Sequence, residues 1–237
     1  MLLRRRHVWL PTLWGWLAIV AVGAVIGGTL AVDAYDLLAP QQPARGRDGA
    51  GARTLVVEGW LGRGEVLQAA ALVRGGRYER VLTTGGPIDP EIDAGGWHTF
   101  AQRAAALLRA EGVATVPVIA VPAPASVQDR SYLSAVMVRE WAQRGGTPLT
   151  AVDLFSAGVH ARRSWLIYRM ALGDAVEVGV LAARPTDHDA RRWWTSSEGA
   201  KTTIGEALSL AWTKCCFWPG PPGSHEERRA VPPSRRP

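Results

Sequence analysis

The pattern of hydrophobic and polar residues divides the chain into one long apolar segment near its start and a series of shorter segments after it. Residues 8–32 carry no charged side chain, three arginines precede them at positions 4–6, and Asp33 and Asp36 follow. About 20 apolar residues are enough for a helix to cross the hydrocarbon core of a bilayer. The pattern therefore predicts one transmembrane helix within residues 1–36.

The charges around this segment predict its orientation. Positive residues are retained on the cytoplasmic side of a membrane, and the arginines lie on the amino-terminal side of the apolar run. We therefore expect a single-pass protein whose N-terminus is cytoplasmic and whose remaining residues lie outside the cytoplasm.

A cleaved signal peptide is the alternative for the same segment. A basic start, an apolar stretch and small residues ending at Ala34 are its usual features. The run is longer than the ~7–15 residues of a signal core, and Trp9, Trp14 and Trp16 suit a membrane interface. These two observations favour an uncleaved anchor, and both interpretations place the rest of the protein outside the cytoplasm.

Short apolar runs alternate with amphipathic segments after a Pro-, Gly-, Gln- and Arg-rich stretch at residues 37–53, which we interpret as a linker that lifts the domain off the membrane. The apolar runs, each expected to be a buried strand, cover residues 55–57, 81–84, 118–121, 151–155 and 176–181. The amphipathic segments, each expected to be a helix, cover residues 65–74, 100–112, 129–144, 160–171 and 197–214.

Unbroken apolar strands that alternate with helices indicate a parallel sheet with helices on both faces. Right-handed crossovers then predict an α/β fold: a Rossmann-like, three-layer α/β/α domain with a mainly parallel five-stranded sheet over residues 54–216. Residues 217–237 are rich in Pro and Arg, and we expect them to form a disordered tail.

The last predicted helix has its own signals. Thr195 and Glu198 have the spacing of a capping box. Ile204, Leu208 and Ala211, with Ala207, fall on one predicted face, which we expect to be the buried one.

Net charge argues against nucleic acid as a partner. The formal charge is +6, but the first seven residues and the tail contribute most of it, so the predicted domain is nearly neutral. A nucleic-acid-binding domain needs a concentrated basic surface. The only cysteines, Cys215 and Cys216, are adjacent, so they build no disulfide framework and have no zinc spacing. We expect neither a metal ion nor a cofactor.

The candidate site lies where the predicted strands end, because parallel sheets bind ligands beyond the carboxyl ends of their strands. Gly85 and Gly86 follow the second strand, and glycines let a backbone approach a ligand closely. Arg130 and Ser131 begin the helix after the third strand. Free N–H groups at a helix start attract anions.

Arginines at helix starts are the strongest indication of a ligand. Arg130, Arg162 and Arg163 fall there, although a cation in the first helical turn is unfavourable by about 0.3–1 kcal/mol. A bound phosphate or carboxylate would remove this conflict, because guanidinium groups bind such anions bidentately. His160 could donate a hydrogen bond to the same anion or transfer a proton.

Other interpretations of these residues stay open. One of the two adjacent arginines has to point away from the other, and His160 could cap its own helix. Glu58, at the end of the first strand, could be a general base or a metal ligand, or it could pair with Arg130 or Arg162. Residues 193–194, a Trp pair, could be an exposed platform for a sugar or lipid, or could pack the last helix onto the sheet.

Four segments together resemble the ElyC/SanA/YdcF family. They are an apolar strand with a glycine turn, Thr-Thr-Gly-Gly at residues 83–86, Asp-Arg-Ser-Tyr at residues 129–132, and Phe-Ser-Ala-Gly-Val-His-Ala-Arg-Arg-Ser at residues 155–164. The resemblance covers about residues 53–183. It implies a Rossmann-like fold, a preceding membrane anchor, and a role in bacterial envelope biogenesis, in peptidoglycan or lipid-carrier metabolism. The pocket residues that it implies are Gly85, Gly86, Arg130, Ser131, His160 and Arg163.

Two positions depart from the family pattern. Many members have an acidic residue at the start of the second helix, where this chain has Trp-His-Thr-Phe at residues 97–100. Many also have Thr and Asn around the third helix, where this chain has Ser131 and Ser134. A catalytic carboxylate shared with the family is therefore absent at the second helix, unless Glu58 has taken over its role.

The expected function is that of a membrane-anchored periplasmic protein of the bacterial inner membrane. It would bind and process a phosphorylated or lipid-linked sugar intermediate, with His160 and Glu58 as the catalytic residues. The alternative is a non-catalytic envelope assembly or ligand-sensing factor that uses the same anion pocket and contacts envelope-synthesis enzymes. A nucleotide or S-adenosylmethionine binder is a third possibility, suggested by the fold alone.

Overall fold

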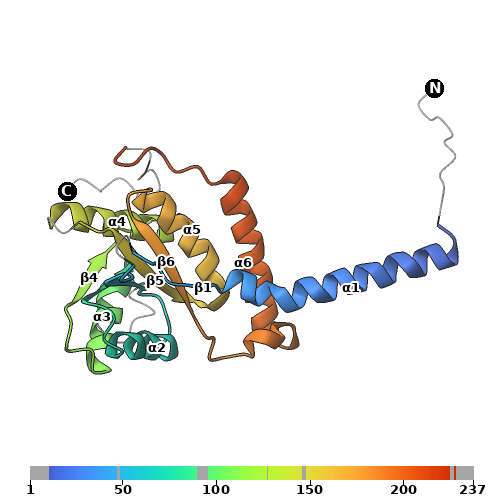
Figure 1. Ribbon diagram of the computed structural model, residues 1–237, viewed down its shortest axis with the longest axis horizontal. Coiled ribbons are helices and arrows are strands. Elements are labelled where there is room, and N and C mark those ends of the chain that lie inside the picture. The colour runs from blue at the N-terminus through green and yellow to red at the C-terminus, as the bar shows by residue number, and fades with distance from the viewer. Residues whose placement is uncertain are drawn as a thin grey trace.

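A computed structural model describes residues 11–46, 49–89, 96–126, 128–145, 148–224 and 227. The arginines at positions 4–6 and Trp9 lie outside the described residues. The described chain forms an α/β domain from which one long helix projects (Figure 1).

The sheet is mainly parallel, as predicted, but it has six strands instead of five. The strands are β1 (Gln41–Gln42), β2 (Thr54–Glu58), β3 (Arg80–Gly85), β4 (Val118–Pro122), β5 (Ala151–Ala157) and β6 (Glu177–Ala183). Their order is β1-β6-β5-β2-β3-β4; β2 to β6 are parallel, and β1 is antiparallel to β6.

The additional strand comes from the predicted linker. Gln41 pairs with Leu181 and Gln42 with Val180, and the backbone N–H of Ala44 donates to Oδ1 of Asp153 at 2.7 Å. Two glutamines at a sheet edge leave no apolar pattern from which a strand could be predicted. The expectation that this segment lifts the domain off the membrane is wrong, because its described part is bonded to the sheet.

Helices cover both faces of the sheet (Figure 1). They are α2 (Arg63–Arg74), α3 (Phe100–Ala110), α4 (Arg130–Arg144), α5 (Ala161–Leu172) and α6 (Ser197–Cys216), with short 3₁₀ helices η1 (Gly158–His160) and η2 (Ala190–Thr195). One core lies between the sheet and α2 and α3, and the other between the sheet and α4 and α5.

The central strand β2 shows why an unbroken apolar run was the correct signal. Leu55, Val56 and Val57 are all fully buried. Side chains of a strand alternate between its faces, so Val56 joins the core under α4 and α5, while its two neighbours join the core under α2 and α3. Burying each of these side chains stabilises the fold by about 1.5–3 kcal/mol.

The projecting helix α1 (Leu13–Leu38) is long and apolar enough to cross a membrane, and its most apolar part is not buried. A signal sequence near an N-terminus can meet the same criteria of length and hydropathy. The last turn of α1 enters the domain: Leu38 packs with Val159 and Leu210, and Ala39 packs against β6 and α5. The helix therefore joins the folded domain directly.

Helix α6 differs from its prediction at its start and on its apolar face. Ser196, not Thr195, caps the helix: its Oγ accepts from the N–H of Gly199 at 3.0 Å, while Thr195 donates to the carbonyl of Arg192. The predicted buried face is exposed. The residues that α6 buries are Gly199, Thr203, Leu210 and Thr213.

The beginning of the predicted tail is part of the folded domain. Phe217 is buried against Tyr132, with ring centroids 5.4 Å apart. Glu227 is buried and forms an ion pair with Arg139 at 2.6 Å. The predicted boundary at residue 217 is therefore too early, because neither a buried aromatic ring nor a buried carboxylate fits a disordered segment.

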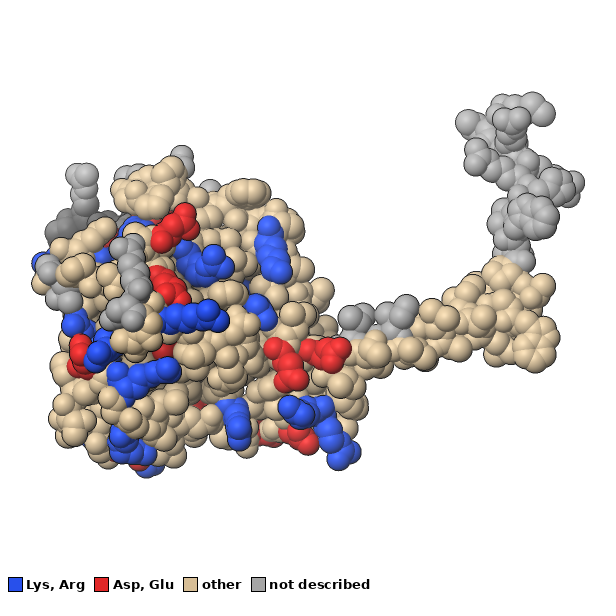
Figure 2. All heavy atoms as spheres, viewed as in Figure 1, with Lys and Arg blue, Asp and Glu red and all other residues tan. Residues whose placement is uncertain are grey.

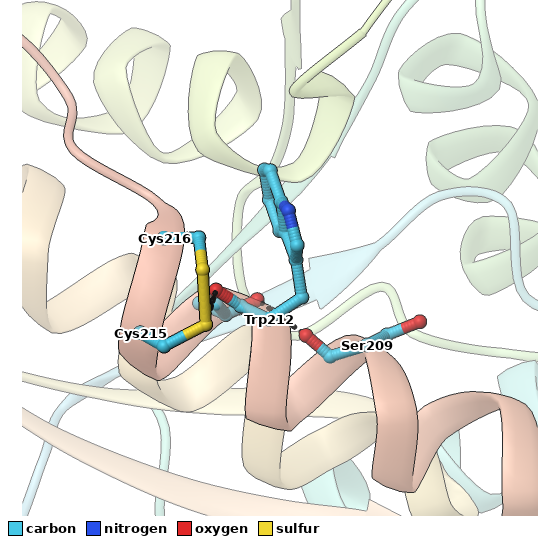
Figure 3. Close-up of a disulfide and its surroundings, with 5 residues drawn as sticks. Ser209, Trp212, Cys215 and Cys216 are labelled. Carbon is cyan, nitrogen blue, oxygen red and sulfur yellow. Dashed lines mark hydrogen bonds between the residues drawn. A yellow bond between two sulfur atoms is a disulfide. The ribbon is translucent and has the colours of Figure 1, made fainter. Parts of the chain in front are cut away.

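Cys215 and Cys216 form a disulfide at the carboxyl end of α6 (Figure 3). Sγ of Cys215 lies 3.6 Å from the carbonyl oxygen of Trp212 on the preceding turn. The bond joins neighbours in the sequence, so it connects no distant segments.

Candidate functional site

A cavity with a volume of about 1120 Å³ lies at the carboxyl edge of the sheet. Its walls come from the ends of β2, β3 and β5, the start of α4 and one side of α6. The strand order reverses between β2 and β5, and open α/β sheets bind their ligands at such a point. Seven of the eight predicted site residues line this cavity: Glu58, Gly85, Gly86, Arg130, Ser131, His160 and Arg163.

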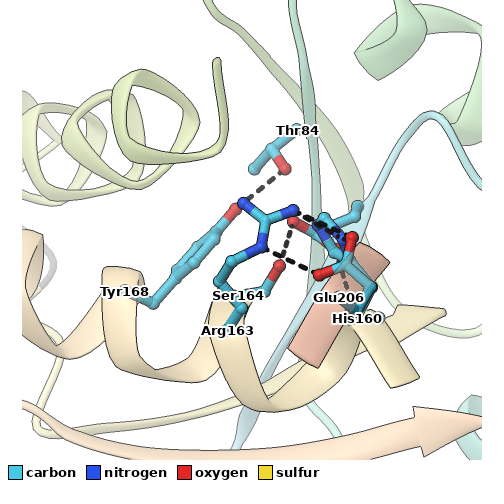
Figure 4. A network of polar contacts seen from close by, with 8 residues as sticks. Thr84, His160, Arg163, Ser164, Tyr168 and Glu206 are labelled. Carbon is cyan, nitrogen blue, oxygen red and sulfur yellow. Dashed lines mark hydrogen bonds and ion pairs between the residues drawn. The ribbon is translucent and has the colours of Figure 1, made fainter. Parts of the chain in front are cut away.

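A carboxylate from α6 holds the histidine and the arginine of the His-x-x-Arg motif (Figure 4). Oε1 of Glu206 lies 2.8 Å from Nδ1 of His160, and its Oε2 accepts from Nε of Arg163 at 2.8 Å. Residues three apart share a helix face. The spacing of the motif therefore allows both side chains to bind the same acceptor.

The hydrogen bonds around His160 indicate which of its two ring nitrogens carries a proton. Nη2 of Arg163 also lies 2.9 Å from Nδ1, but two N–H groups cannot bond to each other. The Glu206 carboxylate is the better acceptor of the two neighbours. Nδ1 therefore carries a proton and donates a hydrogen bond to Glu206. Nε2 has no hydrogen-bond partner among the described residues and lies 4.0 Å from Oε2 of Glu58.

The electrostatics of Glu206 fit this arrangement. Burial by itself would raise the pKa of the Glu206 carboxyl, but hydrogen bonds from His160 and Arg163 outweigh burial and lower the pKa to about 2. Glu206 is therefore a carboxylate at every pH near neutrality.

Glu58 is a buried carboxylate that hydroxyl groups hold in place. Ser164 donates to its Oε1 at 3.0 Å and Ser156 donates to its Oε2. Burial, and after it the charge of Glu58, raise the pKa of Tyr168, whose hydroxyl bonds to Thr84 instead. The predicted ion pair with Arg130 or Arg162 is absent among the described residues, where the basic side chain that approaches Glu58 is the His160 imidazole, with Nε2 4.0 Å from Oε2.

Metal binding by Glu58 finds no support in the part of the chain that the structure describes. Within it, no group of three His, Cys, Asp or Glu side chains is arranged to hold a metal ion. Two serine hydroxyls instead hold the Glu58 carboxyl group in place, and its Oε2 faces Nε2 of His160.

The two glycines at the carboxyl end of β3 differ in the space that a side chain would have. Gly85 has φ 141°, and a Cβ there would lie 2.6 Å from Cβ of Phe100. Gly86 has more space, since its nearest neighbour would be the carbonyl oxygen of Pro124 at 3.4 Å. Gly85 is therefore required by the packing of α3 onto the sheet, whether or not a ligand binds.

Arg162 does not belong to the cavity, so that prediction is wrong. Its Nε donates to the carbonyl oxygen of Leu37 at 2.7 Å, and its guanidinium lies over the ring of Trp165. Successive residues of a helix point about 100° apart. Only one of the two adjacent arginines, Arg163, can therefore face the cavity, and Glu206 already neutralises it.

Arg130 is the cation that remains available at the cavity. It is exposed, it begins α4, and none of the described residues forms an ion pair with it. Asp129 precedes it in a left-handed conformation, with φ 57°, and its side chain does not cap the helix. Among the described residues, the N-cap side chain therefore makes no capping bond to the first N–H groups of α4.

The cavity is more acidic than the sequence suggested. Its lining includes Glu65, Asp187 and Glu198 in addition to Glu58, Glu206 and Asp129. Burial and, after it, the charge of Asp187 raise the pKa of Glu65. An anionic ligand therefore fits best at the α4 end, next to Arg130.

Glu206 is the site residue that sequence reasoning missed. It was overlooked because its position falls outside the family resemblance and opposite the face we expected to be buried. One signal was available: it is the only charged residue between Lys201 and Lys214.

The paired tryptophans have a packing role at least in part. Trp193 is nearly buried, and its Nε1 donates to the carbonyl oxygen of Ala31 on α1 at 2.8 Å. Trp194 stacks edge-on against it with a centroid distance of 5.8 Å and stays half exposed.

The chain matches no protein-family model, and it matches no curated protein.

Proposed function

We propose that this chain is a membrane-anchored protein of bacterial envelope biogenesis with a Rossmann-like, three-layer domain in the periplasm. Helix α1 crosses the inner membrane with its N-terminus in the cytoplasm. The cavity binds a phosphorylated or lipid-linked sugar intermediate, and His160 transfers a proton to or from it. The resemblance to the ElyC/SanA/YdcF family motivates the envelope setting, and the strand order with helices on both faces supports the fold type.

One observation supports proton transfer above all others. Nδ1 of His160 is fixed by an ionised carboxylate, while Nε2 is hydrogen-bonded to nothing in the described chain and faces Glu58 at 4.0 Å. A buried polar atom without a partner costs about 1–3 kcal/mol. A ligand hydroxyl or phosphate oxygen at Nε2 would remove this cost, and a histidine oriented by a carboxylate is a common general acid or base.

The anionic part of the ligand is assigned to the start of α4. Arg130 and the uncapped N–H groups of the first turn offer charge-assisted hydrogen bonds to phosphoryl oxygens. The volume of about 1120 Å³ slightly exceeds the usual ~300–1,000 Å³ of small-molecule sites. It therefore leaves room for a sugar next to the phosphate.

The test is turnover of polyprenyl diphosphates and their sugar-linked forms by the full chain in detergent micelles. We expect His160→Gln to abolish turnover and Arg130→Ala to weaken binding, while Arg162→Ala, whose side chain lies outside the cavity, leaves both unchanged. Loss of activity in Arg162→Ala equal to that in Arg130→Ala would contradict the assignment of the anion to α4.

A non-catalytic binding or assembly factor is the second candidate, and the Glu206 contacts are the observation that favours it. They tie α6 to α5 across the cavity, which is also what a structural clamp would do. If His160→Gln kept full biological activity and Arg130→Ala lost it, binding without proton transfer would be the function. Envelope-synthesis enzymes would then be the partners to seek.

A further inference from the structure

The outer face of α6 carries an exposed apolar stripe, in which only Trp212 has a described aromatic neighbour, Phe217, with ring centroids 6.0 Å apart. Ile204, Leu208 and Trp212 are four residues apart, so they lie along one side of the helix. Their exposed fractions are 52%, 67% and 54%, and Ala207 and Ala211 beside them are exposed as well. Soluble surfaces rarely expose a contiguous apolar stripe of this kind, and such stripes mark interaction sites.

Four exposed basic side chains lie around the stripe, and one of them, Lys201, lies 3.9 Å from the exposed Glu198 carboxylate. Lys201 and Lys214 are exposed near its two ends, and Arg191 and Arg192 are exposed on η2 just before it. The only carboxylate between Gly199 and Cys216 is that of Glu206, which is turned inward to His160 and Arg163. An apolar face flanked by Lys and Arg is typical of a helix that lies in a membrane interface beside anionic headgroups.

The geometry of α1 holds this stripe close to a bilayer. Trp193 already contacts α1 at Ala31, and Leu38 is buried in the domain. The part of α1 before this contact, from Leu13 on, has about 18 residues and measures about 27 Å at a rise of 1.5 Å per residue. The hydrocarbon core of a bilayer is about 30 Å thick. A membrane that α1 crosses therefore leaves no gap between the bilayer and the domain.

The arrangement of the helices agrees with this distance. Helix α6 runs crosswise to α1 and passes it where α1 enters the domain (Figure 1). A helix crosswise to a membrane-spanning helix lies along the membrane plane. The visible surface of α1 is free of charged side chains until it approaches the domain, where acidic side chains are found (Figure 2).

We propose that the outer face of α6, formed by Ile204, Leu208 and Trp212, lies on the periplasmic surface of the bilayer in contact with anionic lipid headgroups and the first acyl carbons. This inference depends on the proposed crossing of the membrane by α1. Leu208 and Trp212 also line the cavity. The cavity mouth therefore borders the bilayer, where a lipid-linked ligand could enter without leaving the membrane.

The experiment is photocrosslinking of the full chain in vesicles of phosphatidylethanolamine and phosphatidylglycerol. A benzophenone amino acid replaces Leu208 in one variant and Ile204 in a second. Leu67 on α2 is the matched control, since it is 40% exposed and α2 lies on the side of the domain away from α1 (Figure 1). Val20, which is exposed on α1, reports on the anchor itself.

We expect lipid adducts at residues 208 and 204 in about tenfold excess over residue 67, because an interfacial helix buries its apolar face about 5–10 Å deep. Adducts at Val20 together with background yields at both α6 positions would overturn the α6 proposal and leave the anchor intact. Background yields at Val20 would overturn the anchor and this proposal with it. Crosslinks between two copies of the chain at residue 208 would also overturn the proposal, in favour of self-association.

Discussion

Nδ1 of His160 and Oε1 of Glu206 lie 2.8 Å apart, although 46 residues separate them in the chain. The contact joins the turn after β5 to α6, two elements that also pack together through Val159 and Leu210. It fixes which nitrogen of the imidazole carries the proton, and it directs the other nitrogen toward Glu58. The orientation of the histidine therefore depends on a helix that the resemblance to a known family does not include.

Acid stability tests this contact. The folded protein lowers the pKa of Glu206 from near 4.5 to about 2. A lowered pKa stabilises the fold above the unfolded value, and this stabilisation is lost as the pH falls from about 4.5 to about 2. We expect Glu206→Gln to reduce the free energy of unfolding at pH 7 by about 2 kcal/mol after solvent screening. The variant should also lose less stability than wild type between pH 5 and pH 2, as measured by urea unfolding in micelles.

Glu198→Gln is the control for this measurement. Glu198 lies on the same helix, but its side chain is exposed and its nearest cation, Lys201, is 3.9 Å away. Its pH profile should follow that of wild type. If Glu206→Gln and wild type lose the same stability on acidification, the Glu206 contacts do not exist in solution.

Replacing Gly85 tests the packing under the cavity floor. Gly85→Ala adds a Cβ at a positive φ of 141° and within 2.6 Å of Cβ of Phe100. Backbone strain and overpacking together should destabilise the fold by about 2–4 kcal/mol. Gly76→Ala is the matched control, because Gly76 also has a positive φ, of 79°, but no atom lies within 4 Å of its added Cβ. It should cost about 1 kcal/mol in urea unfolding, and equal costs for the two variants would refute the close approach of Phe100.

The sequence predicted the parallel strands because each is an unbroken apolar run, and such runs occur where both faces of a sheet are covered. Leu55 to Val57 is the clearest example. It could not predict β1, since Gln41 and Gln42 form a polar edge strand that is held by backbone hydrogen bonds. The sequence also predicted the wrong buried face for α6. Hydrophobicity places Ile204 and Leu208 inside, whereas mainly small and polar residues on the other face pack against the domain.

The site was predictable to the extent that it follows from strand ends. Glu58 and His160 lie where two neighbouring parallel strands end, so their proximity follows from the sheet topology alone. The partner of Arg163 was not predictable, because it comes from a helix whose position depends on tertiary packing. We predicted Arg162 in the cavity because it lies at a helix start. Its position around the helix axis instead directs its side chain toward α1.

The disulfide should contribute little to stability. A disulfide stabilises a protein by restricting the unfolded chain, and this effect is small when the bond joins residues that are already neighbours. We expect reduction of the Cys215–Cys216 bond to change the melting temperature by no more than about 2 °C, or about 0.5 kcal/mol. The double variant Cys215→Ser/Cys216→Ser, scanned with and without reductant, controls for other effects of the reductant. A much larger shift in wild type alone would show that the bond supports the packing at the end of α6.

The carboxylate of Glu227 makes the most strongly buried ion pair among the described residues. It accepts from both terminal nitrogens of Arg139, at 2.6 and 2.8 Å, and from the hydroxyl of Tyr132 at 3.0 Å. The exposed fractions of the Arg139 and Glu227 side chains are 12% and 1%. Burial would raise the pKa of Glu227, but the hydrogen bonds from Arg139 outweigh it and lower the pKa.

Removing this carboxylate should therefore destabilise the whole domain. Glu227→Ala leaves the Arg139 guanidinium buried and uncompensated, which costs about 3–5 kcal/mol. Glu79→Ala, which breaks the exposed pair with Arg53, should cost at most about 1 kcal/mol. Tyr132 also lines the cavity, so Glu227→Ala should weaken ligand binding together with stability. Urea unfolding of both variants in micelles measures the difference, and similar costs for the two would show that residue 227 is not held against α4.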